Sequence, residues 1–393
     1  MCGWKIFTSE ADWTSMSYIE ALLCAILRGE QPDWPRNESK DLETRFIDSA
    51  VFHGVMPLLH EKLEPCWAIE KGWPQGVFDA CHQQALVYTM WELRHRHLLT
   101  QVIEALRTSG IPALLFKGTA LAYGLYATPA SRTRVDSDML VAAEDRFRVG
   151  EILSGLGFST AQSMHGKYVS YEAGFVRYDA SLAHMIDLHW RIHYSQMLSG
   201  LFKFDDLLNR SRPLQGLAAN ALAPCPVDNM LIACLHRSNE LNVPQWINDK
   251  PVLGSERLIW LYDIYLLAQS FSEKDWEELL MRAAQGGLMP SCFDAITKSH
   301  ACFGKVVPER VISTLAENRD ASIVRYQRGS MLSQKWTDWK VLPGMLNKKA
   351  YLLEHIFPPV DYLRERFANQ PIQPLLWLYL RRLGVGIARR LRR

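Results

Sequence analysis

The sequence lacks long apolar runs and a large excess of charge of either sign. No stretch reaches the roughly 18 apolar residues that a bilayer-spanning helix needs. The formal net charge is +2 over 393 residues, which predicts no overall attraction to nucleic acid or to an acidic membrane. The first residues show no basic region followed by an apolar one, so we expect no signal peptide. These features favour a cytoplasmic protein without a transmembrane segment.

The cysteine pattern also excludes some classes of protein. The eight cysteines are scattered, and no two of them have the Cys-x-x-Cys spacing of a zinc site or a redox motif. Nothing in their distribution resembles the framework of a small disulfide-rich domain. We therefore expect reduced and mostly buried thiols.

Hydrophobic periodicity divides the chain into three regions. Residues 1–110 and 198–393 have apolar residues at helical spacing, whereas residues 111–197 contain short strand-like runs. In the middle region we expect a strand over 113–116, a helix over about 119–126, a strand over 137–143, a helix over 144–157 and then a β-rich meander. This order predicts an α+β fold, with a small mixed β-sheet core embedded between an N-terminal and a C-terminal helical region.

Two aspartates one residue apart lead into an apolar strand. Side chains alternate between the faces of a strand, so Asp136 and Asp138 point to one side while Ser137 points to the other. Two carboxylates this close repel each other unless a cation lies between them, and hard oxygen donors suit Mg²⁺. We predict that this pair binds a divalent ion, Mg²⁺ or Mn²⁺.

A third carboxylate, Asp187, lies in another strand-like run, HMIDLHWRIHY. Three aspartates on adjacent strands can hold two Mg²⁺ ions, which is the equipment for in-line phosphoryl or nucleotidyl transfer. The alternative for Asp187 is a structural role, in which it caps a turn or pairs with Arg191.

A candidate phosphate site precedes the aspartates. Gly118 and Thr119 lie between a predicted strand and a predicted helix, so their backbone N–H groups face the anion-favouring end of that helix. Gly118 lets a phosphate approach the backbone closely, and Thr119 adds a hydroxyl donor. Lys117 and Arg132 are nearby cations for phosphate oxygens, although Arg132 is equally suited to hold the Asp136 carboxylate.

In their order along the chain, these motifs resemble the DNA polymerase β-like nucleotidyltransferase superfamily. The resemblance rests on GIPALLFKGTALAYGLY, SRTRVDSDMLV and IDLHWRIH, and within the superfamily it is strongest to the bacterial family described as uncharacterised nucleotidyltransferases. It implies that residues 111–197 form the nucleotidyltransferase core. It also implies that Asp136, Asp138 and Asp187 are the catalytic residues and metal ligands.

The resemblance further implies which residues bind the nucleotide. Gly118 and Thr119 are expected to contact the phosphates of an NTP such as ATP, with Lys117 and Arg132 beside them. His189 shares a face with Asp187, so it either contacts nucleotide or metal or is a packed, hydrogen-bonded histidine.

Two positions depart from the superfamily pattern. Thr119 stands where the superfamily usually has glycine or serine. Ser137 stands between the aspartates, where it usually has an apolar residue, so we expect a buried hydroxyl that needs a partner.

The predicted function is metal-dependent transfer of a nucleoside monophosphate from an NTP to an acceptor, with release of pyrophosphate. The alternatives are a nucleotide-binding or scaffold protein with a degenerate fold, and kinase-like phosphoryl transfer on the same metal site. The sequence does not identify the acceptor, which can be a small molecule, a peptide or a protein. No basic groove dominates, so a polynucleotide is not favoured.

Two features of the C-terminal region have open interpretations. The last residues contain six arginines after Leu380 and no acidic residue. This arginine-rich helix either binds an anionic surface or partner or simply docks through its apolar residues. His236 and Asp263 lie among apolar neighbours on predicted helices, where they either line the cleft or, as we favour, pair with each other.

Overall fold

The structure is a computed structural model. It describes residues 17–35, 41–179, 182–242, 245–247, 250–252, 254–317, 322–366, 374–375, 377–379 and 381. The chain forms two compact units, and each is assembled from separated segments.

One unit, which we call the helical unit, comprises Met1–His95, Leu121–Arg134 and Pro226–Asp320. The other, which we call the sheet unit, comprises Arg96–Ala120, Val135–Cys225 and Ala321–Arg393. These two units are not the three consecutive regions expected from the sequence. The division into residues 1–110, 111–197 and 198–393 stays a prediction.

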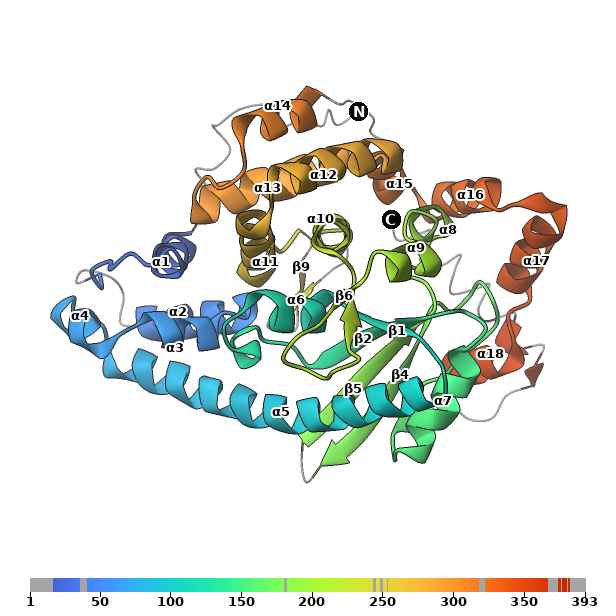
Figure 1. The fold of residues 1–393 in the computed structure, drawn as a ribbon, viewed down its shortest axis with the longest axis horizontal. Coiled ribbons are helices and arrows are strands. Elements are labelled where there is room, and N and C mark those ends of the chain that lie inside the picture. Colours follow the sequence, from blue (N-terminus) through green and yellow to red (C-terminus); the bar gives the residue numbers. More distant parts are fainter. Residues whose placement is uncertain are drawn as a thin grey trace. The chain divides into compact units, whose positions relative to one another are not determined.

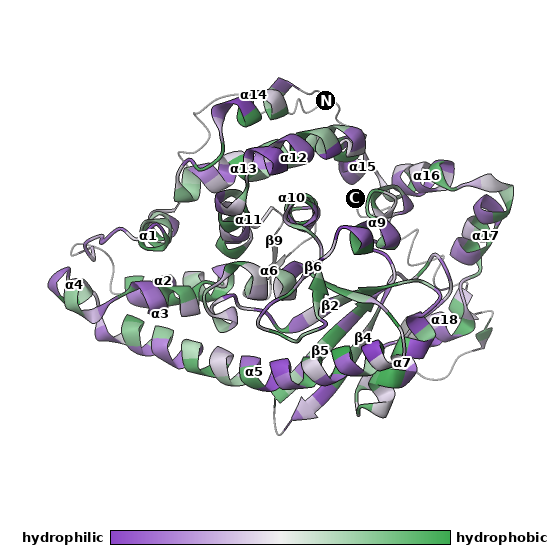
Figure 2. Cartoon of the chain, viewed as in Figure 1, coloured by the Kyte–Doolittle hydropathy of each residue, from purple (hydrophilic) through white to green (hydrophobic). Residues whose placement is uncertain are grey.

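The sheet unit is built on a mixed sheet with the strand order β1-β2-β5-β4-β3 (Figure 1). Its strands are β1 (Ala113–Phe116), β2 (Asp136–Val141), β3 (Ser159–Gln162), β4 (Glu172–Asp179) and β5 (Leu182–His189). β2 pairs antiparallel with β1 and parallel with β5. Figure 2 shows hydrophobic residues along β2 and β5, as their apolar runs predict. The predicted α+β fold with a small mixed sheet is confirmed.

Helices and one short ladder complete the sheet unit. They are the end of α5 (Gln75–Thr108), the start of α6 (Lys117–Leu125), α7 (Arg146–Gly155), α8 (Gln196–Ser199), α9 (Phe204–Asn209), β6 (Arg212–Pro213) paired with β7 (Leu222–Ala223), α15 (Ser322–Arg328), α16 (Met331–Val341), α17 (Gly344–Ile356) and α18 (Val360–Arg366). Gly157, at φ 83°, lies in the left-handed region just past α7, as the predicted stop of that helix requires.

Asp338 joins α16 to the segment that follows β5. Its side chain is only 1% exposed. It accepts hydrogen bonds from Ser195 Oγ at 2.7 Å, the Met197 backbone N–H at 3.0 Å and the Tyr326 hydroxyl at 3.1 Å. A buried carboxylate needs several donors of this kind, so the helices after residue 321 are an integral part of the sheet unit.

The helical unit contains most of the remaining elements. They are α1 (Tyr18–Leu27), α2 (Leu42–His53), α3 (Met56–Lys62), α4 (Pro65–Glu70), the first part of α5, the 3-10 helix η2 (Pro129–Ser131), α10 (Pro226–Glu240), the ladder of β8 (Gln245–Ile247) and β9 (Lys250–Val252), α11 (Leu258–Ser270), α12 (Glu273–Gly286), α13 (Met289–Phe303) and α14 (Glu309–Glu317). Two short ladders thus interrupt the region after residue 198 that was expected to be helical.

Cys24, Cys81, Cys234 and Cys292 are buried thiols, as expected. Among the described residues, no helix combines the length and apolar character that a membrane crossing needs.

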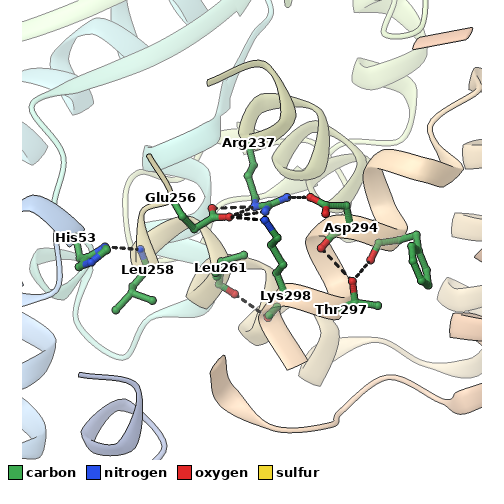
Figure 3. Close-up of polar contacts among 10 residues, drawn as sticks. His53, Arg237, Glu256, Leu258, Leu261, Asp294, Thr297 and Lys298 are labelled. Atoms are coloured by element: carbon green, nitrogen blue, oxygen red, sulfur yellow. Dashed lines mark hydrogen bonds and ion pairs between the residues drawn. The ribbon is translucent and has the colours of Figure 1, made fainter. Parts of the chain in front are cut away.

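A buried arginine forms the polar centre of the helical unit (Figure 3). Arg237 on α10 is 0% exposed, and its guanidinium contacts Glu256 Oε1 at 2.8 Å and Asp294 Oδ2 at 2.7 Å. Burial opposes its positive charge, but the two carboxylates outweigh that effect and raise the pKa of Arg237. A buried cation is stable only when carboxylates of this kind neutralise it. These contacts therefore join α10 to α13 and to the segment before α11.

Candidate functional site

Asp138 on β2 and Asp187 on β5 lie directly opposite each other in the sheet. The strands are parallel, and their register pairs Asp136 with Met185 and Asp138 with Asp187. Because side chains alternate along a strand, Asp136, Asp138 and Asp187 project from one face. The structure therefore brings the three predicted carboxylates to one side of two neighbouring strands.

Lys117 supplies a cation to this face. Its Nζ lies 2.6 Å from Asp138 Oδ1 and 5.1 Å from the centre of the Phe116 ring. Phe116 ends β1 opposite Asp138, so strict alternation would send the next side chain to the other face. Lys117 has φ 49°, a left-handed conformation that is rare for a residue with a Cβ. This turn redirects the chain into α6 and lets the ammonium reach Asp138.

His189 is a buried partner of Asp138. Its Nε2 lies 2.9 Å from Asp138 Oδ1, and its ring packs edge-on against Phe116 with centroids 5.0 Å apart. The side chain is 0% exposed. The packed, hydrogen-bonded alternative therefore describes His189, which orients Asp138, and a direct contact with nucleotide stays a prediction.

Glu172 is a carboxylate that the sequence motifs did not single out. It begins β4, where the register pairs it with His189, and its Oε2 lies 3.3 Å from His189 Nδ1. Nothing in the local sequence marks Glu172, because its place depends on how β4 pairs with β5. It gives His189 a carboxylate on each ring nitrogen.

The pKa values of Asp138 and Asp187 are shifted in opposite directions. Burial by itself would raise the pKa of Asp138, but the Lys117 ammonium and the His189 hydrogen bond hold that pKa well below its usual range. Burial and the negative charges of Asp138 and Glu172 raise the pKa of Asp187 to about 6. Carboxyl groups whose pKa values are pushed apart can take different roles in acid–base chemistry.

Gly118 and Thr119 lie inside the first turn of α6, and not before it as expected. The helix already begins at Lys117, so the backbone N–H groups of residues 117–119 lack an intrahelical partner. The Thr119 side chain is 0% exposed, and its Oγ1 lies 2.7 Å from Ser137 Oγ. Ser137 thus has the partner that we expected it to need. The Thr119 hydroxyl is directed into the core, which departs from its expected contact with phosphate.

Arg132 belongs to the helical unit, where it pairs with Asp263. Its Nη2 lies 2.8 Å from Asp263 Oδ2, and the Tyr126 hydroxyl donates to Asp263 Oδ1 at 2.7 Å. The favoured pairing of His236 with Asp263 is wrong, because His236 lies 3.9 Å from a carboxylate oxygen of Glu240 instead. The contact of Arg132 with nucleotide or with Asp136 stays a prediction.

The donor set suits a hard divalent cation, although the carboxylates are not gathered as a metal cage. Within the described ranges, no three histidine, cysteine, aspartate or glutamate side chains are arranged to hold a metal ion. Burial, and after it the negative charges of Asp138 and Glu172, raise the pKa of Asp187, and a cation at this face would offset that repulsion. Lys117 pairs with Asp138 Oδ1 in this structure, so its ammonium would compete with a metal ion for that oxygen. The three-aspartate ligand set stays a prediction.

The predicted anionic contact of the arginine-rich C-terminus falls mostly outside the described residues. Residues 382–393 are not among them. Arg381 is described, and its guanidinium lies 5.1 Å from the centre of the Trp377 ring. This stacking is compatible with either interpretation of the C-terminus.

Comparisons with known proteins assign the chain to a family. Among solved structures it is similar to the antibiotic-resistance factor ANT(2″)-Ia, with 15% identity over 53% of this chain and 98% of that chain. The TM-score is 0.32, too low to carry an argument about this chain. No curated protein matches. A family model described as "Uncharacterised nucleotidyltransferase" matches residues 39–304. Because this match covers more than half of the sequence, the chain belongs to the uncharacterised nucleotidyltransferases.

Proposed function

We propose that the protein transfers a nucleoside monophosphate from an NTP to an acceptor oxygen. The acceptor oxygen forms a bond to the α-phosphorus, and the bond from that phosphorus to the β-phosphate oxygen breaks. Pyrophosphate leaves with the electron pair. The observation that carries the proposal is the direct register of Asp138 with Asp187 on parallel strands, with their pKa values shifted in opposite directions.

The carboxylates have separate roles in this proposal. Asp136, Asp138 and Asp187 hold the divalent ions, Mg²⁺ or Mn²⁺, which when bound stabilise charge on the attacking and leaving oxygens. In the metal-free protein the pKa of Asp187 is about 6, so this carboxylate is ionised at neutral pH, and its position beside Asp138 suits it to accept the proton of the acceptor hydroxyl. His189 keeps Asp138 in one orientation through its 2.9 Å contact.

The first turn of α6 holds the triphosphate. Its backbone N–H groups at Gly118 and Thr119 are unsatisfied by the helix and favour an anion. The Lys117 ammonium lies 2.6 Å from Asp138 Oδ1, and with a divalent ion on that aspartate it would pair with a phosphate oxygen of the bound triphosphate instead. Lys117 thus keeps a negative partner before and after the nucleotide binds. The acceptor that we propose is a small molecule, a peptide or a protein.

Calorimetric titration with non-hydrolysable ATP, GTP, CTP and UTP analogues tests the donor site without knowledge of the acceptor. We expect Mg²⁺-dependent binding of at least one analogue, and loss of that binding in Asp136→Ala/Asp138→Ala. Asp205→Ala/Asp206→Ala is the matched control, because it removes two exposed acidic residues of the sheet unit with the same change of charge. Absence of binding to all four analogues by folded wild-type protein would refute the proposal and favour a scaffold.

A further inference from the structure

Helix α17 turns its polar side toward the rest of the sheet unit. Glu354 accepts hydrogen bonds from the backbone N–H groups of residues 167–169 at 2.6–3.1 Å. Asn347 Oδ1 accepts from the Tyr168 hydroxyl at 3.0 Å. Tyr351 is 2% exposed and packs edge-on against Tyr168, with ring centroids 5.4 Å apart. Residues 347, 351 and 354 recur at helical spacing, so they form the inner face of α17.

The opposite face of α17 is apolar and lies in solvent. An ordinary surface helix has the reverse arrangement, with its apolar stripe against the core. The exposed fractions reach 85% for Leu346 and 73% for Met345. The exposed apolar residues of this face are Met345, Leu346, Leu352, Leu353 and Ile356, followed by Phe357.

Helix α16 extends this apolar exposure with aromatic and basic side chains. Trp336 is 55% exposed and stacks on Trp339 with ring centroids 4.8 Å apart. Lys340 Nζ lies 5.3 Å from the centre of the Trp336 ring, and Lys348 Nζ of α17 lies 5.0 Å from that of Trp339. Met331 and Leu332 are also exposed. We use the name α16–α17 surface for the following residues: Met331, Leu332, Trp336, Lys340, Met345, Leu346, Lys348, Lys349, Leu352, Leu353, Ile356 and Phe357.

The exposed charge of these two helices is positive. Between residues 331 and 356 the acidic residues are Asp338 and Glu354. Asp338 is buried, and Glu354 is bonded to backbone N–H groups. Lys340 and Lys349 are exposed. The six arginines after Leu380 add further positive charge to the same end of the sequence, although the whole chain carries only +2.

We propose that the α16–α17 surface docks the protein on an anionic membrane surface. Helices that lie in the membrane interface combine an apolar face with tryptophan and lysine, as these two helices do. We do not expect a second copy of the chain to cover this surface. Lys349 lies within the apolar face of α17, so two copies packed through this face would bring their lysines together. The surface also lies beyond residues 39–304, which the family model matches.

Co-sedimentation of the full chain with lipid vesicles tests the proposal. Vesicles of phosphatidylcholine alone are compared with vesicles that also contain phosphatidylserine, at low and at high salt. We expect binding to the anionic vesicles that weakens with salt. Leu346→Ser/Leu353→Ser should lower the partition coefficient by about tenfold or more. Lys348→Glu/Lys349→Glu should abolish the preference for anionic vesicles.

A matched control is available on another helix. Leu86→Ser/Met90→Ser removes two apolar residues of α5 that are 52% and 55% exposed, and it should bind vesicles as wild type does. All substituted positions of the α16–α17 surface lie at or near the protein surface, so the circular dichroism spectrum and Tm should stay unchanged.

Three outcomes would overturn the proposal. The first is that wild type sediments with neither vesicle. The second is that Leu346→Ser/Leu353→Ser binds as wild type does, which would assign binding to another part of the chain, such as the arginine-rich terminus. The third is a dimer of wild type in light scattering that becomes a monomer in Leu346→Ser/Leu353→Ser, which would make the surface an interface between copies.

Discussion

Thr119 and Ser137 are hydrogen-bonded to each other in the core of the sheet unit, with their side-chain oxygens 2.7 Å apart. They are the two positions at which the sequence departs from the superfamily pattern. Either hydroxyl alone would be a buried polar group without this partner, which costs stability. Together they satisfy each other, so the two departures form one compensated change and do not indicate a decaying site.

The Thr119–Ser137 pair should show strong coupling. Thr119→Val leaves the Ser137 hydroxyl without this partner and should lower the free energy of unfolding by about 1–2 kcal/mol. Thr119→Val/Ser137→Ala should recover most of that loss. Urea unfolding of the four proteins of this double-mutant cycle measures the coupling, and strictly additive losses would contradict it. Binding of the NTP analogue should survive Thr119→Val, because the hydroxyl points into the core.

Asp187 should make the metal-free protein less stable as the pH rises. Its pKa is about 6 in the folded chain against an ordinary value of 3.8, so the unfolded chain releases this proton at lower pH. Stability associated with the protonated group is therefore lost between about pH 4 and pH 6. Asp187→Asn should be more stable than wild type by about 1 kcal/mol at pH 7, after allowance for solvent screening of this half-buried group. At pH 4 the two proteins should be alike in urea unfolding, and an equal gain at both pH values would argue against this account.

Mg²⁺ binding should weaken on acidification. Protonation of Asp187 below about pH 6 removes a ligand oxygen charge, so the affinity measured by calorimetry should fall between pH 7.5 and pH 5.5. Asp138 stays ionised over this range, because its pKa is held well below the usual value. Asp187→Asn should bind Mg²⁺ weakly, and with little dependence on pH. A wild-type affinity that is constant over the same range would exclude Asp187 from the ligand set.

Lys117 should compete with the metal ion for Asp138. Its ammonium lies 2.6 Å from Asp138 Oδ1, so Lys117→Met removes a cation that the metal must displace. Because this pair is largely buried, its loss should raise the Mg²⁺ affinity without nucleotide by about fivefold or more. Affinity for the NTP analogue should fall at the same time, because the triphosphate loses its lysine. Lys117→Arg keeps the charge and serves as the control, and weaker Mg²⁺ binding by Lys117→Met would show that the two cations do not compete.

The ion pair between Arg132 and Asp263 should stabilise the helical unit. Both side chains are largely buried, and Arg132→Met leaves the Asp263 carboxylate without its cation. This should lower the free energy of unfolding by about 3 kcal/mol. His236→Ala should cost about 1 kcal/mol or less, because His236 is partly exposed and Asp263 pairs with Arg132 instead. Thermal or urea unfolding distinguishes the two variants, and equal losses would restore the pairing of His236 with Asp263.

The sequence by itself determined the local elements of the site and the faces of its side chains. The strand at residues 113–116 matches β1, and the strand expected over 137–143 overlaps β2, which begins at Asp136 and ends at Val141. Because side chains alternate along a strand, the opposite orientations of Asp138 and Ser137 follow from their positions alone. The burial of Ser137 and its need for a partner were expected from the resemblance to the superfamily, which usually has an apolar residue at this position, and Ser137 is buried.

Only the tertiary structure decided which groups meet. The pairing of Asp138 with Asp187, and the approach of Glu172 to His189, depend on how β2, β4 and β5 align. A strand pattern specifies which face a side chain takes, but the neighbouring strand and its register are set by packing of the whole unit. The left-handed conformation of Lys117 was likewise not predictable from the local sequence. It depends on how the chain turns from β1 into α6, and this turn brings the Lys117 ammonium to Asp138.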